Sequence, residues 1–104
     1  MRIRGIAAGL VLSGALVVSA GAQVEKAGIT HTQLLRADLA GVPAKELIVF
    51  DTRYAPNAIN PKHYHTSQIT FYVLEGSGIW QEEGKVPVTL NSGSILMVTP
   101  GTVH

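Results

Sequence analysis

Cysteine is absent from this chain of 104 residues, charged residues make up only 14% of it and aromatic residues 6%. A chain without cysteine forms no disulfide, so its stability has to come from an apolar core, helped by a metal ion or a partner subunit. The sequence has no basic patch, which argues against nucleic acid as a partner. The length predicts a single domain.

The N-terminal segment is the most apolar part of the chain. Arg2 and Arg4 precede an uncharged, largely apolar run from Gly5 to Val18, and Ala20-Gly21-Ala22 has the small-x-small pattern of a cleavage site. We therefore predict a signal peptide over residues 1–22, with export to the periplasm or to the outside. The run is shorter than the roughly 18 apolar residues of a membrane-spanning helix, so we expect a mature chain that is not embedded in a membrane.

Strand signals dominate the remainder of the chain, residues 23–104. Runs rich in β-branched and aromatic residues alternate with turns that contain Gly, Pro and Asn, which favours an antiparallel sandwich or barrel. The runs cover residues 46–54, 69–74, 79–83, 86–90 and 94–99, and the third and fourth form a hairpin around Glu83-Gly84-Lys85. Residues 23–44 are ambiguous, because Leu34, Leu35 and Leu39 suit a short helix as well as an extended lead-in.

Two histidines lie one residue apart, immediately before the second of these runs. In an extended chain His63 and His65 point the same way, so their imidazoles can share a metal ion. An isolated pair of this kind is more often exposed in a loop. The wider sequence context has to decide between the two interpretations.

That context resembles the two signatures of the cupin superfamily. The first signature has a Gly, the histidine pair, a Glu and a closing Gly, and the second has Gly, Pro-x-Gly and a further His. Asn57 takes the place of the opening Gly and tolerates the same backbone conformation in turns. The matching positions are His63, His65 and Gly76 in the first signature, and Gly93, Gly101 and His104 in the second.

The resemblance implies a fold and a ligand set. The fold would be all-β, an antiparallel jelly-roll β-barrel of the cupin type over residues 23–104, with His63, His65 and His104 as ligands of a metal inside it. The family's carboxylate position holds Ile69, which cannot ligate. Gln68 beside it is a candidate fourth ligand, although a hydrogen bond in the turn or exposure to solvent is the simpler interpretation. Without a carboxylate, Fe, Ni, Zn or Cu is expected as the divalent metal.

The family pattern continues with further strands after its last histidine. We therefore expect the barrel to be incomplete at its C-terminal end, with unpaired strand edges that favour a homodimer. Two functions follow from the resemblance. One is a metalloenzyme, best described as a dioxygenase acting on a small organic molecule. The alternative is a cupin that binds a small molecule or a metal without turnover, so the sequence leaves open whether the protein is an enzyme.

Overall fold

The computed structural model describes residues 1–5 and 23–104, and most of the predicted signal peptide, residues 6–22, lies outside them. The described residues form strands and no helix, so no helix among them is long and apolar enough to cross a membrane. The strands are β1 (Arg2–Gly5), β2 (Gln23–Lys26), β3 (Ile29–Asp38), β4 (Glu46–Tyr54), β5 (Ile69–Glu75), β6 (Ser77–Trp80), β7 (Val88–Asn91) and β8 (Ile95–Val98).

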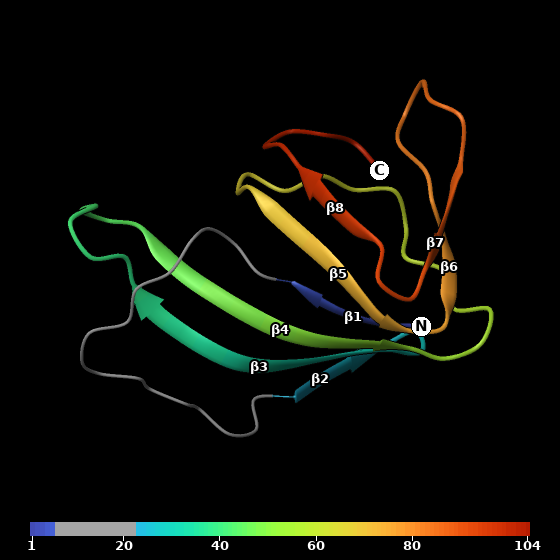
Figure 1. Cartoon of the computed structure of the whole chain (residues 1–104), viewed down its shortest axis with the longest axis horizontal. Helices are drawn as coiled ribbons and strands as arrows, with labels where there is room; N and C mark the ends of the chain where they lie inside the picture. Colours follow the sequence, from blue (N-terminus) through green and yellow to red (C-terminus); the bar gives the residue numbers. More distant parts are fainter. Residues whose placement is uncertain (6–22) are drawn as a thin grey trace.

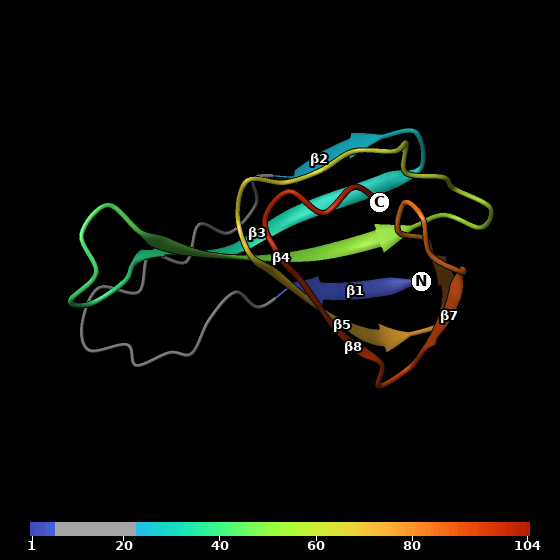
Figure 2. The same ribbon diagram turned by 90° about the horizontal axis from the view of Figure 1, so that it is seen from above.

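Two antiparallel sheets make up the fold. A six-stranded sheet has the order β2-β3-β4-β1-β5-β8, and β6 and β7 form a two-stranded sheet. The large sheet is strongly curved, and the small sheet stands at the end of β5 beside the N-terminus (Figure 1). Seen from above, the chain between β4 and β5 and the C-terminal segment run on the same side of the large sheet (Figure 2). The prediction of an all-β, jelly-roll-like fold is confirmed.

The ambiguous segment at 23–44 is extended. Its residues form β2 and β3, and β3 pairs with the full length of β4. The helical alternative for Leu34, Leu35 and Leu39 is therefore wrong. A register shift between Gln33 and Leu35 marks an irregularity in the ladder at the adjacent Leu34 and Leu35, and Leu39 follows the end of β3. Long-range strand pairing has overridden the local helical spacing.

The core lies where the two sheets meet. Ile3 of β1, Val73 of β5 and Leu90 of β7 are buried together, and Trp80 and Leu96 pack against them. Val73 retains only 1% of its accessible surface. The alternation within β5 agrees with this arrangement, because every second side chain of a strand faces the same side of the sheet.

The N-terminal strand occupies an interior position of the large sheet. β1 pairs with β4 on one side and with β5 on the other. Arg2 also binds the buried Asp51 of β4, with its Nη2 2.7 Å from Oδ2 and its Nε 3.1 Å from the same oxygen. Residues 1–5 of the predicted signal peptide thus belong to the folded sheet, and cleavage after Ala22 would remove them.

The turn positions named from the sequence have the backbone that glycine favours. Asn57, in the place of the first signature's opening Gly, has a φ of 64°. Gly76, between β5 and β6, has a φ of 83°, and Gly93 and Gly101 have φ values of 86° and 79°. A residue with a Cβ is strained in this left-handed region, which Asn tolerates better than most. The intervals between these positions in the two signatures are therefore the intervals between turns of the backbone.

Candidate metal centre

Three histidines that are far apart in the sequence come together outside the strands. His63 and His65 lie in the connection between β4 and β5, and His104 lies in the segment that follows β8. The two segments are joined by backbone hydrogen bonds that link His63 and His104 in both directions, and by Gly101 N–H donating to the carbonyl of His65 at 2.8 Å. The histidine pair thus lies outside the strands, and both of its rings point to the same side, with their Nε2 atoms 3.1 Å apart.

The three imidazoles are close enough to share one ion. One nitrogen from each ring can be chosen so that all three lie within 4.8 Å of one another. The Nε2 atoms of His63 and His65 are 3.1 Å apart. Three nitrogens bound tetrahedrally to a metal at about 2.0–2.1 Å would be separated by roughly 3.4 Å, so the His63–His65 pair already has nearly the spacing that such a site requires. All three side chains are half-buried, which leaves the group accessible from solvent.

Two of the rings are held by backbone carbonyl groups. Nδ1 of His63 lies 2.5 Å from the carbonyl oxygen of Pro61, and Nδ1 of His104 lies 3.0 Å from that of Thr102. A carbonyl oxygen only accepts, so we assign the proton of each ring to Nδ1. The lone pair of each ring is then on Nε2, and a hydrogen bond from the other nitrogen to a carbonyl is the usual support of a metal-binding histidine.

The environment of two of the three rings favours their neutral form. Burial, followed by the charges of His63 and His104, lowers the pKa of His65 below its ordinary value. Burial also lowers the pKa of His104, although the carbonyl of Thr102 and the charge of Glu82 act in the opposite direction. A neutral imidazole is the form that binds a metal, so the surroundings of His65 and His104 favour ligation.

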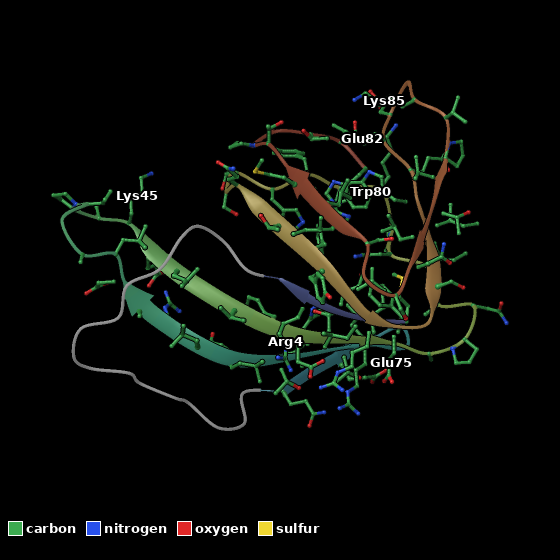
Figure 3. The ribbon with its side chains drawn as sticks, in the orientation of Figure 1. Arg4, Lys45, Glu75, Trp80, Glu82 and Lys85 are labelled. Atoms are coloured by element: carbon green, nitrogen blue, oxygen red, sulfur yellow. The ribbon has the colours of Figure 1, made fainter. Side chains whose placement is uncertain are left out.

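Two side chains beside the histidines were not predicted as part of the site. The indole of Trp80 stacks on the ring of His104, with centroids 4.4 Å apart and an angle of 26° between the planes. Its Nε1 lies 3.4 Å from Oε1 of Glu82, and Oε2 of Glu82 binds Lys85. Figure 3 shows these three residues on the small sheet and its loop, on the side of the C-terminal segment. Nothing in the sequence signals this contact, because Trp80 and His104 belong to different elements.

The candidate fourth ligand lies on the other face of the sheet. The amide nitrogen of Gln68 is 2.8 Å from Sδ of Met97, whose side chain is 62% exposed. Ile69, one residue later, pairs with the buried Val98 and so faces the interior. The structure thus places Ile69, and not Gln68, on the face that the family's carboxylate would use.

The fourth histidine of the chain is separate from the cluster. His31 lies on β3, and its Nδ1 is 3.0 Å from Oγ1 of Thr52 on β4. This hydrogen bond and the edge-on contact with Phe50 hold the His31 side chain against β4. Its partner was not visible in the sequence because Thr52 lies on the neighbouring strand, 21 positions further along the chain.

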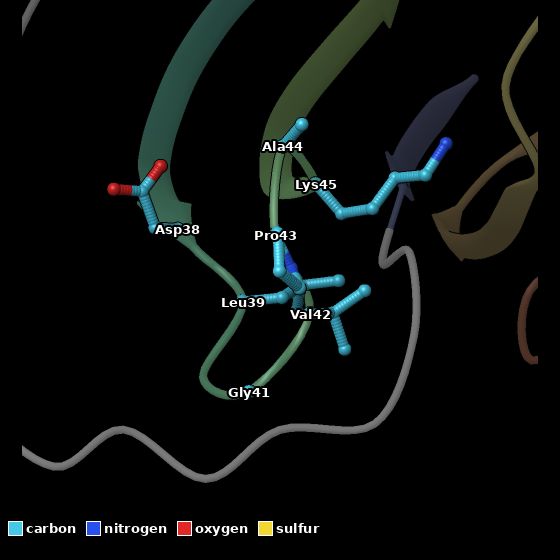
Figure 4. A pocket seen from close by; sticks show the side chains of 7 residues that line it. All are labelled: Asp38, Leu39, Gly41, Val42, Pro43, Ala44 and Lys45. Atoms are coloured by element: carbon cyan, nitrogen blue, oxygen red, sulfur yellow. The ribbon is translucent and has the colours of Figure 1, made fainter.

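A hollow at the far end of the molecule has a different character. It is formed by the turn that joins β3 to β4, from Asp38 to Lys45 (Figure 4). The side chains of Asp38 and Lys45 point to opposite sides of this turn. The hollow lies away from the histidines (Figure 1) and offers no convergent polar groups, so we assign it no chemistry.

Comparison with known protein families supports the interpretation of the histidine cluster. Residues 50–104 match the family described as Cupin domain, which is more than half of the chain. The chain therefore belongs to the cupin family. No curated protein and no solved structure matches the sequence with significance.

Proposed function

We propose that this protein is a metal-binding cupin in which His63, His65 and His104 hold one divalent transition metal ion. The observation that carries the proposal is the pair of carbonyl contacts, to Pro61 and Thr102, that leave the Nε2 atoms of His63 and His104 free to ligate. An all-nitrogen set of three neutral ligands suits Zn, Cu, Ni or Fe better than Mn or Mg.

The close approach of the His63 and His65 rings also supports an ion. With the proton of His63 on Nδ1, its Nε2 is an acceptor, so in the metal-free chain Nε2 of His65 must donate across the 3.1 Å separation. Nδ1 of His65 can take up that proton when an ion replaces the hydrogen bond. The ion would supply Lewis-acid or redox chemistry, and the histidines would fix its position at the half-buried site.

The metal site is tested by titrating the purified chain with Zn(II), Ni(II) and Cu(II) in a calorimeter. We expect binding of one ion per chain, and loss of binding when any one of the three histidines is replaced by alanine. His31→Ala is the matched control, because His31 lies on the sheet outside the cluster. Equal binding by the chain and by its His104→Ala variant would refute the three-ligand site.

For the activity, we propose a dioxygenase-like metalloenzyme that acts on a small organic molecule. A site with three protein ligands keeps coordination positions open, and the half-buried rings leave room for a substrate. Oxygen consumption by the Fe(II)-loaded protein with diketones, phenols and thiols tests this activity. The alternative is a cupin that binds a small molecule or a metal without turnover. It is favoured by the apolar Ile69 at the position where the family has its carboxylate. If the metal-loaded protein consumed no oxygen with any of these compounds, the result would support this alternative.

The cellular setting is also part of the proposal. The basic start and apolar run of residues 1–22 support export, with a mature cupin domain over residues 23–104 in the periplasm or outside the cell. The edge strand β8 carries exposed Ile95 and Met97 and supports association into a homodimer. Mass spectrometry of the exported protein tests the cleavage site, and light scattering tests the dimer.

A further inference from the structure

Among the residues that the structure describes, Trp80 is the one aromatic residue outside the three histidines that contacts a proposed ligand face to face. The planes of Trp80 and His104 are inclined by 26°, whereas His63 meets His104 at 64° in an edge contact. A stacked contact fixes the plane of a ring more strongly than an edge contact does, because tilting either ring separates the two surfaces.

The plane of His104 decides whether its nitrogen can reach the metal. The lone pair of Nε2 lies in the ring plane, so a metal has to lie close to that plane. The hydrogen bond from Nδ1 to the carbonyl of Thr102 sets how the ring is turned within its plane. Stacking on Trp80 sets the plane itself. The two contacts together leave the ring one direction in which to ligate.

His104 depends on such support because it lies beyond the last strand. β8 ends at Val98, and backbone hydrogen bonds hold the segment after it, such as the one from Glu83 N–H to the carbonyl of Val103 at 2.9 Å. These bonds position the backbone of His104. The carbonyl of Thr102 restrains how the His104 ring is turned within its plane, as the carbonyl of Pro61 does for His63, but it does not fix the plane of the ring.

Trp80 is itself well supported. It pairs with Val88 across the small sheet, packs on the core cluster and contacts Phe71, with ring centroids 5.6 Å apart. Its indole N–H faces Glu82, whose second carboxylate oxygen lies 2.9 Å from Nζ of Lys85. An indole held on three sides is a rigid surface for a second ring.

We propose that Trp80 is a positioning residue that fixes the ring plane of His104 for metal binding. This role rests on the proposed metal site and adds to it a residue that does not touch the ion. Trp80 is also the one tryptophan of the chain, so its fluorescence reports on the ion without any added probe.

The experiment compares Trp80→Phe and Trp80→Leu with the unsubstituted chain. Stacking is first measured in the metal-free protein by NMR, where the ring protons of His104 should be shifted upfield by the indole and should move downfield in Trp80→Leu. Zn(II) affinity is then measured by calorimetry. We expect a loss of about 10-fold in Trp80→Leu, as for other residues that support a ligand, and a smaller loss in Trp80→Phe, which keeps an aromatic face.

Leu96→Ala is the matched control for packing, because Leu96 packs against the same core cluster as Trp80 and lies on β8, outside the two segments that carry the histidines. It should lower the melting temperature while retaining Zn(II) affinity. Cu(II) should quench the fluorescence of the unsubstituted chain and should give a different EPR spectrum in Trp80→Leu. Unchanged affinity and an unchanged spectrum in Trp80→Leu would overturn the positioning role.

The two proposals fail in different ways. If the unsubstituted chain binds no metal although its His104 signals are shifted by the indole, the metal site is refuted and the positioning role falls with it, while the stacking stands. If the chain binds metal but the His104 signals are not shifted, the positioning role alone is refuted.

Discussion

His63 and His104, 41 positions apart in the sequence, exchange two backbone hydrogen bonds, from N–H of His63 to the carbonyl of His104 at 2.8 Å and from N–H of His104 to the carbonyl of His63 at 2.9 Å. This is the arrangement of a hydrogen-bonded pair in an antiparallel ladder, although neither residue lies in a strand. It brings the third imidazole to the first two, so the site exists only when the segment after β8 is in place.

Replacing His65 and disturbing the C-terminal segment that carries His104 should weaken metal binding by different routes. His65→Ala removes a ligand and leaves the backbone pairing of the loop intact, so we expect Zn(II) affinity to fall by more than about 100-fold with little change in stability. Thr102→Pro retains all three rings but disturbs the last residues of the chain, and should also weaken binding. Competition with a chromophoric chelator measures both affinities. Full affinity in Thr102→Pro would show that the position of the C-terminal segment is unimportant.

The stability of the metal-free chain should fall on acidification. The pKa values of His65 and His104 in the folded chain lie below the ordinary value of 6.5, so the unfolded chain binds protons first as the pH drops. The free energy of unfolding therefore rises with pH in this range. The stabilisation is fully present above pH 6.5 and is lost as the pH falls toward the lowered values. Urea unfolding at pH 5 and pH 8 measures it.

The double variant His65→Gln with His104→Gln is the control for this pH dependence, since it removes both titrating rings. We expect its midpoint of urea unfolding to change less between the two pH values than that of the unsubstituted chain. An equal change would assign the dependence to other groups. Asp51 is not one of them, because Arg2 lowers the pKa of Asp51 below its ordinary value of 3.8, so its contribution is lost only in more acidic solution than pH 5.

Removal of residues 1–22 should destabilise the sheet. The shortened chain loses β1, which pairs with both β4 and β5, and with it the buried Ile3 and the partner of Asp51. We expect the free energy of unfolding to drop by more than about 2 kcal/mol, which is the order of the contribution from burying one Ile side chain such as Ile3. Thermal unfolding of the 82-residue product of the predicted cleavage, residues 23–104, measures the loss.

Asp51→Asn in the whole chain is the matched control, because it weakens the contact with Arg2 and retains β1. Its loss of stability should be smaller than that of the shortened chain. If residues 23–104 alone unfold at the same temperature as the whole chain, then another segment or a second copy fills the position of β1, and light scattering distinguishes these two.

A carboxylate restored at position 69 should change the metal preference. Ile69 faces the interior beside Val98, so Ile69→Glu adds an anionic oxygen ligand on that face. We expect the affinity for Mn(II) to rise relative to that for Zn(II), because carboxylate oxygen suits the harder ion. Thr70→Glu is the control on the opposite face, where its partner Met97 is exposed. The same change of preference in both variants would show that the added charge acts without ligating.

The sequence by itself determined the strands from Glu46 onward, because their β-branched and aromatic runs are bounded by turns whose backbone needs Gly or Asn. The left-handed φ of Asn57 and Gly93 is a local property, and the spacing of such turns is what the cupin signatures record. The resemblance to these signatures also implies that His63, His65 and His104 form one group of ligands.

Contacts between distant segments fixed the remaining features of the fold. Residues 23–26 and 29–38 form strands because β3 pairs with β4, and no local pattern reveals this pairing. The place of β1 inside the sheet, the exposure of Gln68 and the stacking of Trp80 on His104 were likewise set by pairing and packing. Periodicity gives the face on which a side chain lies, but its neighbour across the interior is fixed only when the whole chain has folded.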